Sequence, residues 1–139
     1  KRCLFYKAEV PKAFVGNWKK FDEDDDAEGK ATISENGVIS TDSDDTDILI
    51  AKPLREYLVN KSGKVDNDKV QKEFDKIQKS LKSHGYQAKS VNDIYHDEKG
   101  LYYFVFVVVN GSKRIIVLED ATIIPIQVIL KKKVLANIR

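Results

Sequence analysis

Several kinds of residue are scarce in this chain, and each shortage argues against a class of protein. A single cysteine, Cys3, leaves no partner for an intramolecular disulfide, so the fold is not a disulfide-stapled scaffold. The longest uninterrupted apolar run covers nine residues, 101–109, whereas a membrane-spanning helix needs roughly 20. Arginine occurs four times and the aromatic residues gather in one apparent core strand, which disfavours a nucleic-acid-binding surface.

Methionine is also absent, and the sequence opens at Lys1. We therefore expect that a signal sequence or membrane anchor has been removed ahead of it, with a removed tag or neighbouring domain as the alternative. On this view residues 1–12 are a membrane-proximal stalk or leader remnant, and residues 13–139 form a single β-rich domain. The expected location is extracytoplasmic, at the surface of a bacterial cell or anchored to its membrane.

The residues that are present suit a globular protein, with 42% apolar and 33% charged residues in a chain of 139. The net charge of +2 hides an asymmetry, because residues 22–47 contain eleven acids and one lysine. Six of those acids lie within residues 22–28, in the stretch FDEDDDAEGK. Such a block affects solubility and electrostatic steering rather than fold, and a solvated acidic turn is its simplest interpretation.

Two Asn-Gly pairs mark hairpins. Asn36-Gly37 lies within the stretch KATISENGVIST, and Asn110-Gly111 follows the run LYYFVFVVV. Asparagine and glycine tolerate the positive φ angles that both central positions of a type I′ turn require, so we expect such a turn at each pair. Further strands are expected at residues 13–21, 47–51, 86–95 and 123–131, with Pro125 indicating a sheet edge or a bulge.

One long helix is expected over residues 66–84, after a short one that begins at Pro53. Its apolar stripe, at the helical period of 3.6 residues, consists of Val70, Phe74, Ile77 and Leu81. Asp66 or Asn67 is suited to cap the helix at its start, and Gly85 stands where a left-handed stop belongs. A stripe of this kind usually packs on a sheet.

The run 101–109 has no polar alternation, so both faces of that strand need cover. The helix can cover one face, while the other must lie inside a closed barrel, against a second sheet or against another chain. The sequence therefore predicts an α+β domain. Its antiparallel, curled or partly closed β-sheet has seven or eight short strands and carries one main amphipathic helix.

A near-match to a calcium-binding EF-hand loop starts within the acidic block. Its first, third, fifth and twelfth places are taken by Asp24, Asp26, Glu28 and Glu35, with Gly29 at the sixth. Alternating carboxylates of this kind are the ligands that calcium prefers. The segment after the loop reads as a hairpin rather than a helix, so we expect a solvated turn, with a looser calcium site as the alternative.

Signals of catalysis are weak. No Gly-x-Ser-x-Gly elbow and no phosphate-binding glycine loop occurs. The two histidines, His84 and His96, lack the short spacing that is typical of a zinc site. Nothing in the pattern marks two carboxylates as buried together. We therefore expect no enzymatic activity and no cofactor other than calcium.

A family resemblance enters at Gly16-Asn17-Trp18. These residues on an expected first strand, followed by an acidic loop and a hairpin, resemble the Gly-x-Trp opening of lipocalin-like (calycin) barrels. They are also similar to the openings of small exported Gram-positive domains. The calycin resemblance implies that Trp18 packs across the barrel floor, covered by one of the lysines at 131–133. It also implies a small hydrophobic ligand, with Trp18, Tyr103, Phe104 and Phe106 as its contacts.

The order of elements differs from that family, because calycins place their helix after most of the strands. A helix at 66–84, near the middle of the chain, disfavours a full eight-stranded cup. The alternative role for Trp18 is that of a core anchor, because large aromatic residues supply much buried area.

Taken together, these features predict a non-enzymatic binding domain that recognises another protein at the cell surface. Such a domain has a filled interior and an exposed strand edge or apolar patch. The first alternative is a calycin-like carrier of a small hydrophobic ligand, with a cavity of ~300 Å3 or more beneath Trp18. The second is a calcium-responsive module that acts through the acidic loop 22–35.

Overall fold

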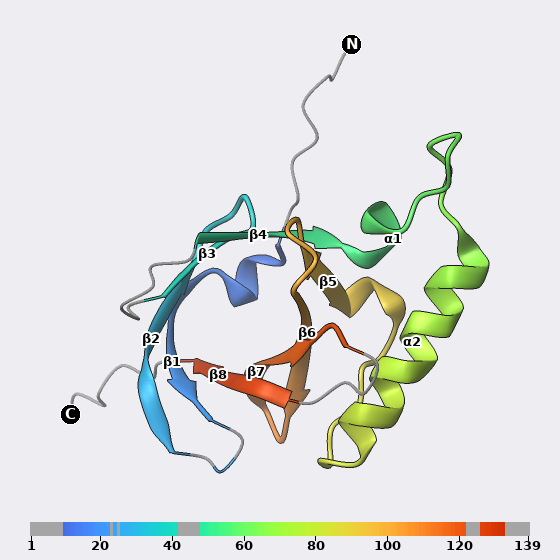
Figure 1. Cartoon of the computed structure of the whole chain (residues 1–139). Coiled ribbons are helices and arrows are strands. Elements are labelled where there is room, and N and C mark those ends of the chain that lie inside the picture. Colours follow the sequence, from blue (N-terminus) through green and yellow to red (C-terminus); the bar gives the residue numbers. More distant parts are fainter. Residues whose placement is uncertain (1–9, 23, 25, 42–47, 122–125, 133–139) are drawn as a thin grey trace, which may run out of the picture.

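Eight antiparallel strands follow one another around a closed barrel in the computed structural model of the chain (Figure 1). The structure describes residues 10–22, 24, 26–41, 48–121 and 126–132. The strands are β1 (Gly16–Phe21), β2 (Ala27–Ile33), β3 (Val38–Thr41), β4 (Ile48–Pro53), β5 (Ile94–Asp97), β6 (Tyr102–Val109), β7 (Ser112–Glu119) and β8 (Ile126–Lys132). Each strand pairs with its neighbour in the chain, and β1 pairs with β8 to close the ring.

The helices lie at one end of the barrel and along its outside. They are η1 (Lys12–Phe14), α1 (Leu54–Tyr57), α2 (Asn67–Lys82) and η2 (Val91–Asp93). The predicted long helix and its caps are confirmed, because Asp66 Oδ1 accepts the Lys69 N–H at 3.2 Å and Gly85 has φ +83°. Among the described residues, no helix combines the length and apolar character needed to cross a membrane.

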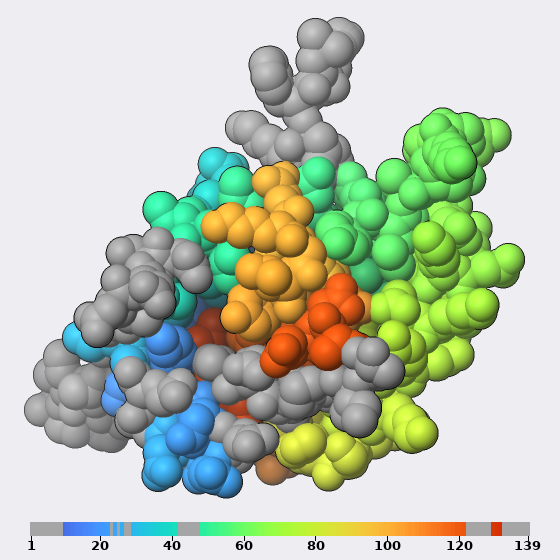
Figure 2. Space-filling view, in the orientation of Figure 1, coloured from blue at the N-terminus to red at the C-terminus, as the bar shows by residue number. Residues whose placement is uncertain are grey.

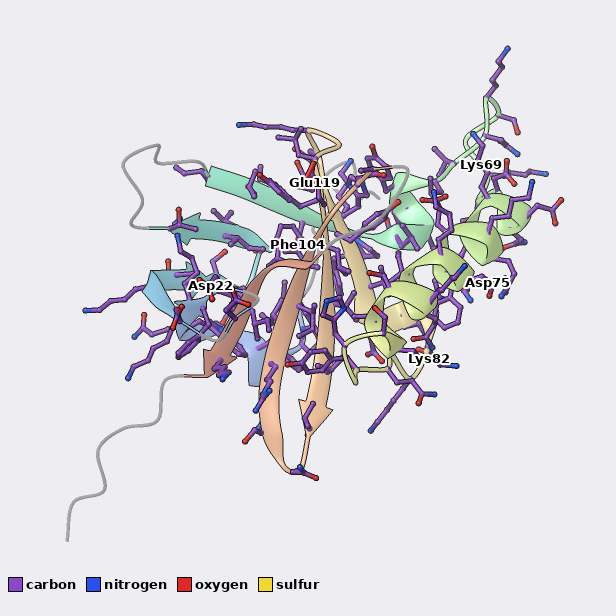
Figure 3. All side chains as sticks on the ribbon, turned by 60° about the horizontal axis from the view of Figure 1, so that its bottom comes forward. Asp22, Lys69, Asp75, Lys82, Phe104 and Glu119 are labelled. Carbon is purple, nitrogen blue, oxygen red and sulfur yellow. The ribbon has the colours of Figure 1, made fainter. Side chains whose placement is uncertain are left out.

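Strand β6 is covered on both faces, as its sequence predicts. Phe104 and Phe106 belong to the cluster that also contains Trp18, in the barrel interior. Tyr103, Val105 and Val107 alternate with them and join the second cluster, which contains the α2 residues Ile77 and Leu81. Figure 3 shows Phe104 between the strands, while the labelled polar residues of α2 face solvent. The interior of the barrel and the underside of α2 therefore provide the two covers.

The sheet closes fully, although a helix in mid-chain was expected to disfavour a complete eight-stranded cup. That expectation was wrong because the segment between β4 and β5, which contains α1 and α2, leaves the ring and returns to it. Strands β4 and β5 still pair directly, with Ala51 opposite Asp97 and Pro53 opposite Tyr95. An insertion that packs on the outside does not interrupt the hydrogen-bonded ring.

The described part of the expected stalk is attached to the barrel. Val10 and Phe14 are buried in the interior cluster, and the Val10 N–H donates to the Glu35 carbonyl at 3.4 Å. Residues 1–9 lie outside the described part of the chain. Residues 10–12 therefore belong to the barrel domain rather than to a separate stalk.

The two Asn-Gly hairpins use different turns. Asn110 and Gly111 have φ of 50° and 81°, which confirms the type I′ turn between β6 and β7. At the β2–β3 hairpin only Gly37 has a positive φ, of 82°, so the expectation of a type I′ turn was wrong there. The Gly37 N–H donates to the Ser34 carbonyl at 3.1 Å, and the Ser34 hydroxyl accepts the Val38 N–H. These bonds form a longer turn that ends at a left-handed glycine.

Replacement of Leu81 by alanine tests the packing of α2. Leu81 is fully buried beneath the helix, so Leu81→Ala should lower the free energy of unfolding by about 2–5 kcal/mol. Lys79→Ala removes an exposed side chain from the same helix and should change the free energy of unfolding by less than about 0.5 kcal/mol. Urea unfolding of both variants measures the difference. Equal losses would show that α2 does not pack on the barrel as described.

Candidate functional site

Two polar residues, His96 and Asp97, are fully buried at the end of β5. The Asp97 carboxylate accepts three backbone N–H groups, from Lys99, Leu101 and Tyr102, at 2.9, 2.8 and 2.6 Å. These bonds hold the β5–β6 turn and satisfy both carboxylate oxygens. Asp97 is therefore a structural residue of the turn.

Both ring nitrogens of His96 have close oxygen partners. Nδ1 lies 2.8 Å from the Asp97 carbonyl oxygen, which only accepts, so Nδ1 carries a proton. Nε2 lies 2.7 Å from Asp120 Oδ2, in the segment after β7.

Two aromatic rings enclose the imidazole. The ring of Tyr57 in α1 is stacked on His96 at 3.9 Å between centroids, with 3° between the planes. The ring of Tyr103 in β6 meets it edge-on at 4.7 Å. Tyr57 and Tyr103 thus bring a short helix and a barrel strand against the same buried histidine.

The Tyr103 hydroxyl extends the network to α2. It donates to Glu73 Oε1 and lies 3.2 Å from Asp120 Oδ1. Burial raises the pKa of the Tyr103 phenol well above the usual tyrosine range, and the hydrogen bond to Glu73 and the charge of Asp120 raise it further. Burial also raises the pKa of Tyr57, with smaller contributions from the charges of Asp120 and Asp97.

We call these five residues the His96 cluster: Tyr57, Glu73, His96, Tyr103 and Asp120. A histidine paired with a carboxylate and a phenol is chemically able to transfer protons. Its imidazole, however, has no exposed surface. Among the other members, Tyr57 is partly exposed, and the side chains of Asp120 and Glu73 are 30% and 23% exposed. A substrate therefore has no access to the ring, and the cluster fastens α1 and α2 to the barrel.

Aromatic rings stack along the barrel interior. Phe14 from η1 lies parallel to Trp18 at 5.9 Å and stacks on Phe106 at 4.7 Å, while Phe106 stacks on Tyr95 at 4.8 Å. The Trp18 indole N–H donates to the Phe14 carbonyl at 3.0 Å. Phe14 thus contacts Trp18 twice, through its ring and through its carbonyl oxygen, which accepts the indole N–H.

The four residues suggested as ligand contacts are divided between the two clusters. Trp18, Phe104 and Phe106 face the interior, whereas Tyr103 lies outside the barrel and bonds to Glu73. Of the lysines suggested as a cover for Trp18, Lys131 lies over the Phe21 ring, with its Nζ 4.4 Å from the centroid.

The remaining two lysines provide no described cover for the tryptophan. Lys132 is the backbone partner of Trp18, and its side chain, like the whole of Lys133, lies outside the described part.

The acids of the suggested calcium site do not converge. Asp24 and Asp26 lie in the β1–β2 turn, where both backbone N–H groups bond to Asp22 Oδ1 at 2.9 and 2.8 Å. Glu28 is in β2, and Glu35 is exposed at the far end of that strand, roughly 20 Å away at the usual rise of a strand. Within the described residues no group of three or more potential ligands is placed to hold a metal.

The outer face of β3 and β4 carries apolar side chains that nothing in the described part of the chain covers fully. Val38 lies opposite Ile50, and Ser40 lies opposite Ile48, on the face away from the interior. Ile48 and Ile50 are 56% and 39% exposed, while Leu49 between them is buried inside. Figure 2 shows the atoms of this part of the chain (cyan to teal) at the surface, on the side away from α2. We call Val38, Ile48 and Ile50 the β3–β4 face.

Sequence reasoning missed most of the His96 cluster. His96 lacks the sequence spacing of a zinc site, and its side-chain partner is Asp120, 24 residues away. His84, the other candidate, is exposed just after α2. Its Nδ1 lies 3.0 Å from the Ser83 hydroxyl and 3.2 Å from the Ser80 carbonyl oxygen. The one available signal was a histidine directly after the apolar residues Ile94 and Tyr95, at the end of an expected strand.

Comparison with known proteins gives no assignment. No protein-family model, no curated protein and no solved structure matches this chain.

The pKa of Tyr103 predicts a loss of stability in alkali. A phenol whose pKa is higher in the folded than in the unfolded chain stabilises the fold below the unfolded value of about 10, and this contribution is lost as the pH rises above it. Tyr103→Phe should remove that part of the alkaline loss in urea unfolding, whereas the neighbouring Tyr102→Phe should keep it. Parallel pH profiles for wild type and Tyr103→Phe would contradict the burial of this hydroxyl.

Proposed function

We propose that this chain is a non-enzymatic, extracytoplasmic domain that recognises another protein through the β3–β4 face. The observation that supports this most is the uncovered state of Ile48 and Ile50. Strand β4, like β6, has apolar residues in succession, and such strands usually have cover on both faces. Helix α2 provides that cover for β6 but not for β4. A partner protein would complete the burial.

The energetic gain from such a partner is considerable. Full burial of one isoleucine side chain stabilises a complex by about 1.5–3 kcal/mol, and Ile48 and Ile50 lie two positions apart on one strand. Around them lie Ser40 and the ion pair of Lys52 with Glu98, whose charged atoms are 3.6 Å apart. An apolar centre with a polar surround is typical of a protein interface.

Closure of the barrel favours recognition by side chains over strand addition. In the described ring every strand has two neighbours, so no strand edge offers free backbone groups to a partner. Of the two binding surfaces expected from the sequence, an exposed strand edge or an apolar patch, the proposal therefore uses the apolar patch.

The aromatic contacts around Trp18 support protein recognition over the carrier alternative. A carrier needs ~300 Å3 or more beneath Trp18, and Phe14 lies parallel to that ring and bonds to its indole N–H. The His96 cluster, with its inaccessible imidazole, supports the proposal that the domain is not an enzyme. The extracytoplasmic location rests on the sequence alone.

Site-specific photo-crosslinking tests the β3–β4 face. A photoreactive phenylalanine analogue at position 48 should give a discrete protein adduct in the producing cell, and the same analogue at position 79 on α2 should not. Ile50→Lys should abolish the adduct by placing a charge in the apolar contact. Val108→Lys, at an equally exposed apolar residue on β6, should leave it intact. The same set of crosslinked adducts from positions 48 and 79 would refute the proposal. So would an adduct at position 48 that Ile50→Lys leaves unchanged.

A further inference from the structure

A pocket of about 100 Å3 opens beside the end of β6, away from the β3–β4 face. Its apolar lining includes Phe14 and Phe106, whose stacked rings are 4.7 Å apart, and Val108. Val108 is half exposed, although its neighbours Phe106 and Val107 are buried. An apolar group that entered the pocket would cover these surfaces.

Polar side chains from a single segment line the same pocket. They are Gln87, Lys89 and Asp93, in the connection from α2 to β5. In the part of the chain that the structure describes, neither Lys89 nor Asp93 makes an ion pair, and the Gln87 side chain makes no hydrogen bond. One cation, one anion and one amide are therefore available next to an apolar surface.

The size of the pocket restricts what it can hold. Drug-sized ligands occupy ~300–1,000 Å3, so such molecules are too large. An engineered apolar cavity of ~150 Å3 binds benzene, so a pocket of about 100 Å3 suits a branched aliphatic group. Charges of both signs at the edge of the pocket suit a ligand that itself carries both charges.

We propose that this pocket binds a free α-amino acid with an aliphatic side chain. The aliphatic side chain lies against Phe14, Phe106 and Val108, where it displaces water from apolar surface. The ammonium group pairs with Asp93 and the carboxylate with Lys89, while Gln87 supplies a further hydrogen bond. This site is separate from the β3–β4 face, so each proposal can fail without the other.

Titration of the 15N-labelled protein with four probes tests the pocket. L-Leucine carries both charges, L-leucinamide only the ammonium, N-acetyl-L-leucine only the carboxylate, and the dipeptide Leu-Gly carries its charges farther apart. We expect saturable shifts at the amides of residues 87–93 and 106–108 with L-leucine, in the millimolar range. Each of the other three probes should bind at least several-fold more weakly.

Two charge-removing variants assign the contacts. Lys89→Gln should weaken L-leucine and N-acetyl-L-leucine but leave L-leucinamide unchanged. Asp93→Asn should weaken L-leucine and L-leucinamide but leave N-acetyl-L-leucine unchanged. Lys79→Gln, which removes an exposed lysine from α2, is the matched control and should change none of the affinities.

Several results would overturn the proposal. One is the absence of saturable shifts with L-leucine at tens of millimolar, and another is shifts that map to other residues. A singly charged probe that binds the wild type as tightly as L-leucine would exclude the two-charge contact. Tighter binding of Leu-Gly would show that the pocket takes a peptide terminus instead. The probe series on the wild type remains decisive even if Asp93→Asn does not fold.

Discussion

Strand β6 has apolar residues along nearly its whole length, and this strand needs cover on both faces. The inner cover is the ring of strands itself, in which Phe106 stacks between Phe14 and Tyr95. The outer cover is α2, whose Ile77 and Leu81 share a cluster with the outward residues of β6. Closure of the barrel and docking of the helix thus meet one requirement, and the His96 cluster adds polar contacts at the same junction.

The cover of the barrel exterior is uneven, and the proposed function depends on that unevenness. The outward residues of β5, β6 and β7 lie in the cluster beneath α1 and α2. On the other side of the ring, Ile48 and Ile50 have no such cover in the described structure. A closed barrel with stacked rings inside is a stiff support, so a partner that docks on β4 meets a preorganised surface. Preorganisation lowers the entropic cost of association.

Local signals predicted the long helix and one hairpin, whereas the strand expected at residues 86–95 was wrong, because β5 covers only Ile94–Asp97. The period of α2, its cap Asp66 and the turn at Asn110-Gly111 depend on neighbours within a few residues, and all three are confirmed. The need to cover both faces of β6 also followed from sequence, but closure did not, because the pairing of β1 with β8 joins strands about 110 residues apart in the numbering. The bond between His96 and Asp120 was missed for a similar reason, since it depends on register across three strands.

The aromatic stack in the barrel interior distinguishes a protein-binding domain from a carrier, and Trp18 reports on that stack directly because it is the only tryptophan in the chain. A brominated fatty acid quenches indole fluorescence when it binds in contact with the ring. We predict that Trp18 emission stays unquenched throughout a titration with such a fatty acid, because the ring is 1% exposed and stacked on Phe14. Saturable quenching would contradict the account and would favour a carrier with a cavity beneath Trp18.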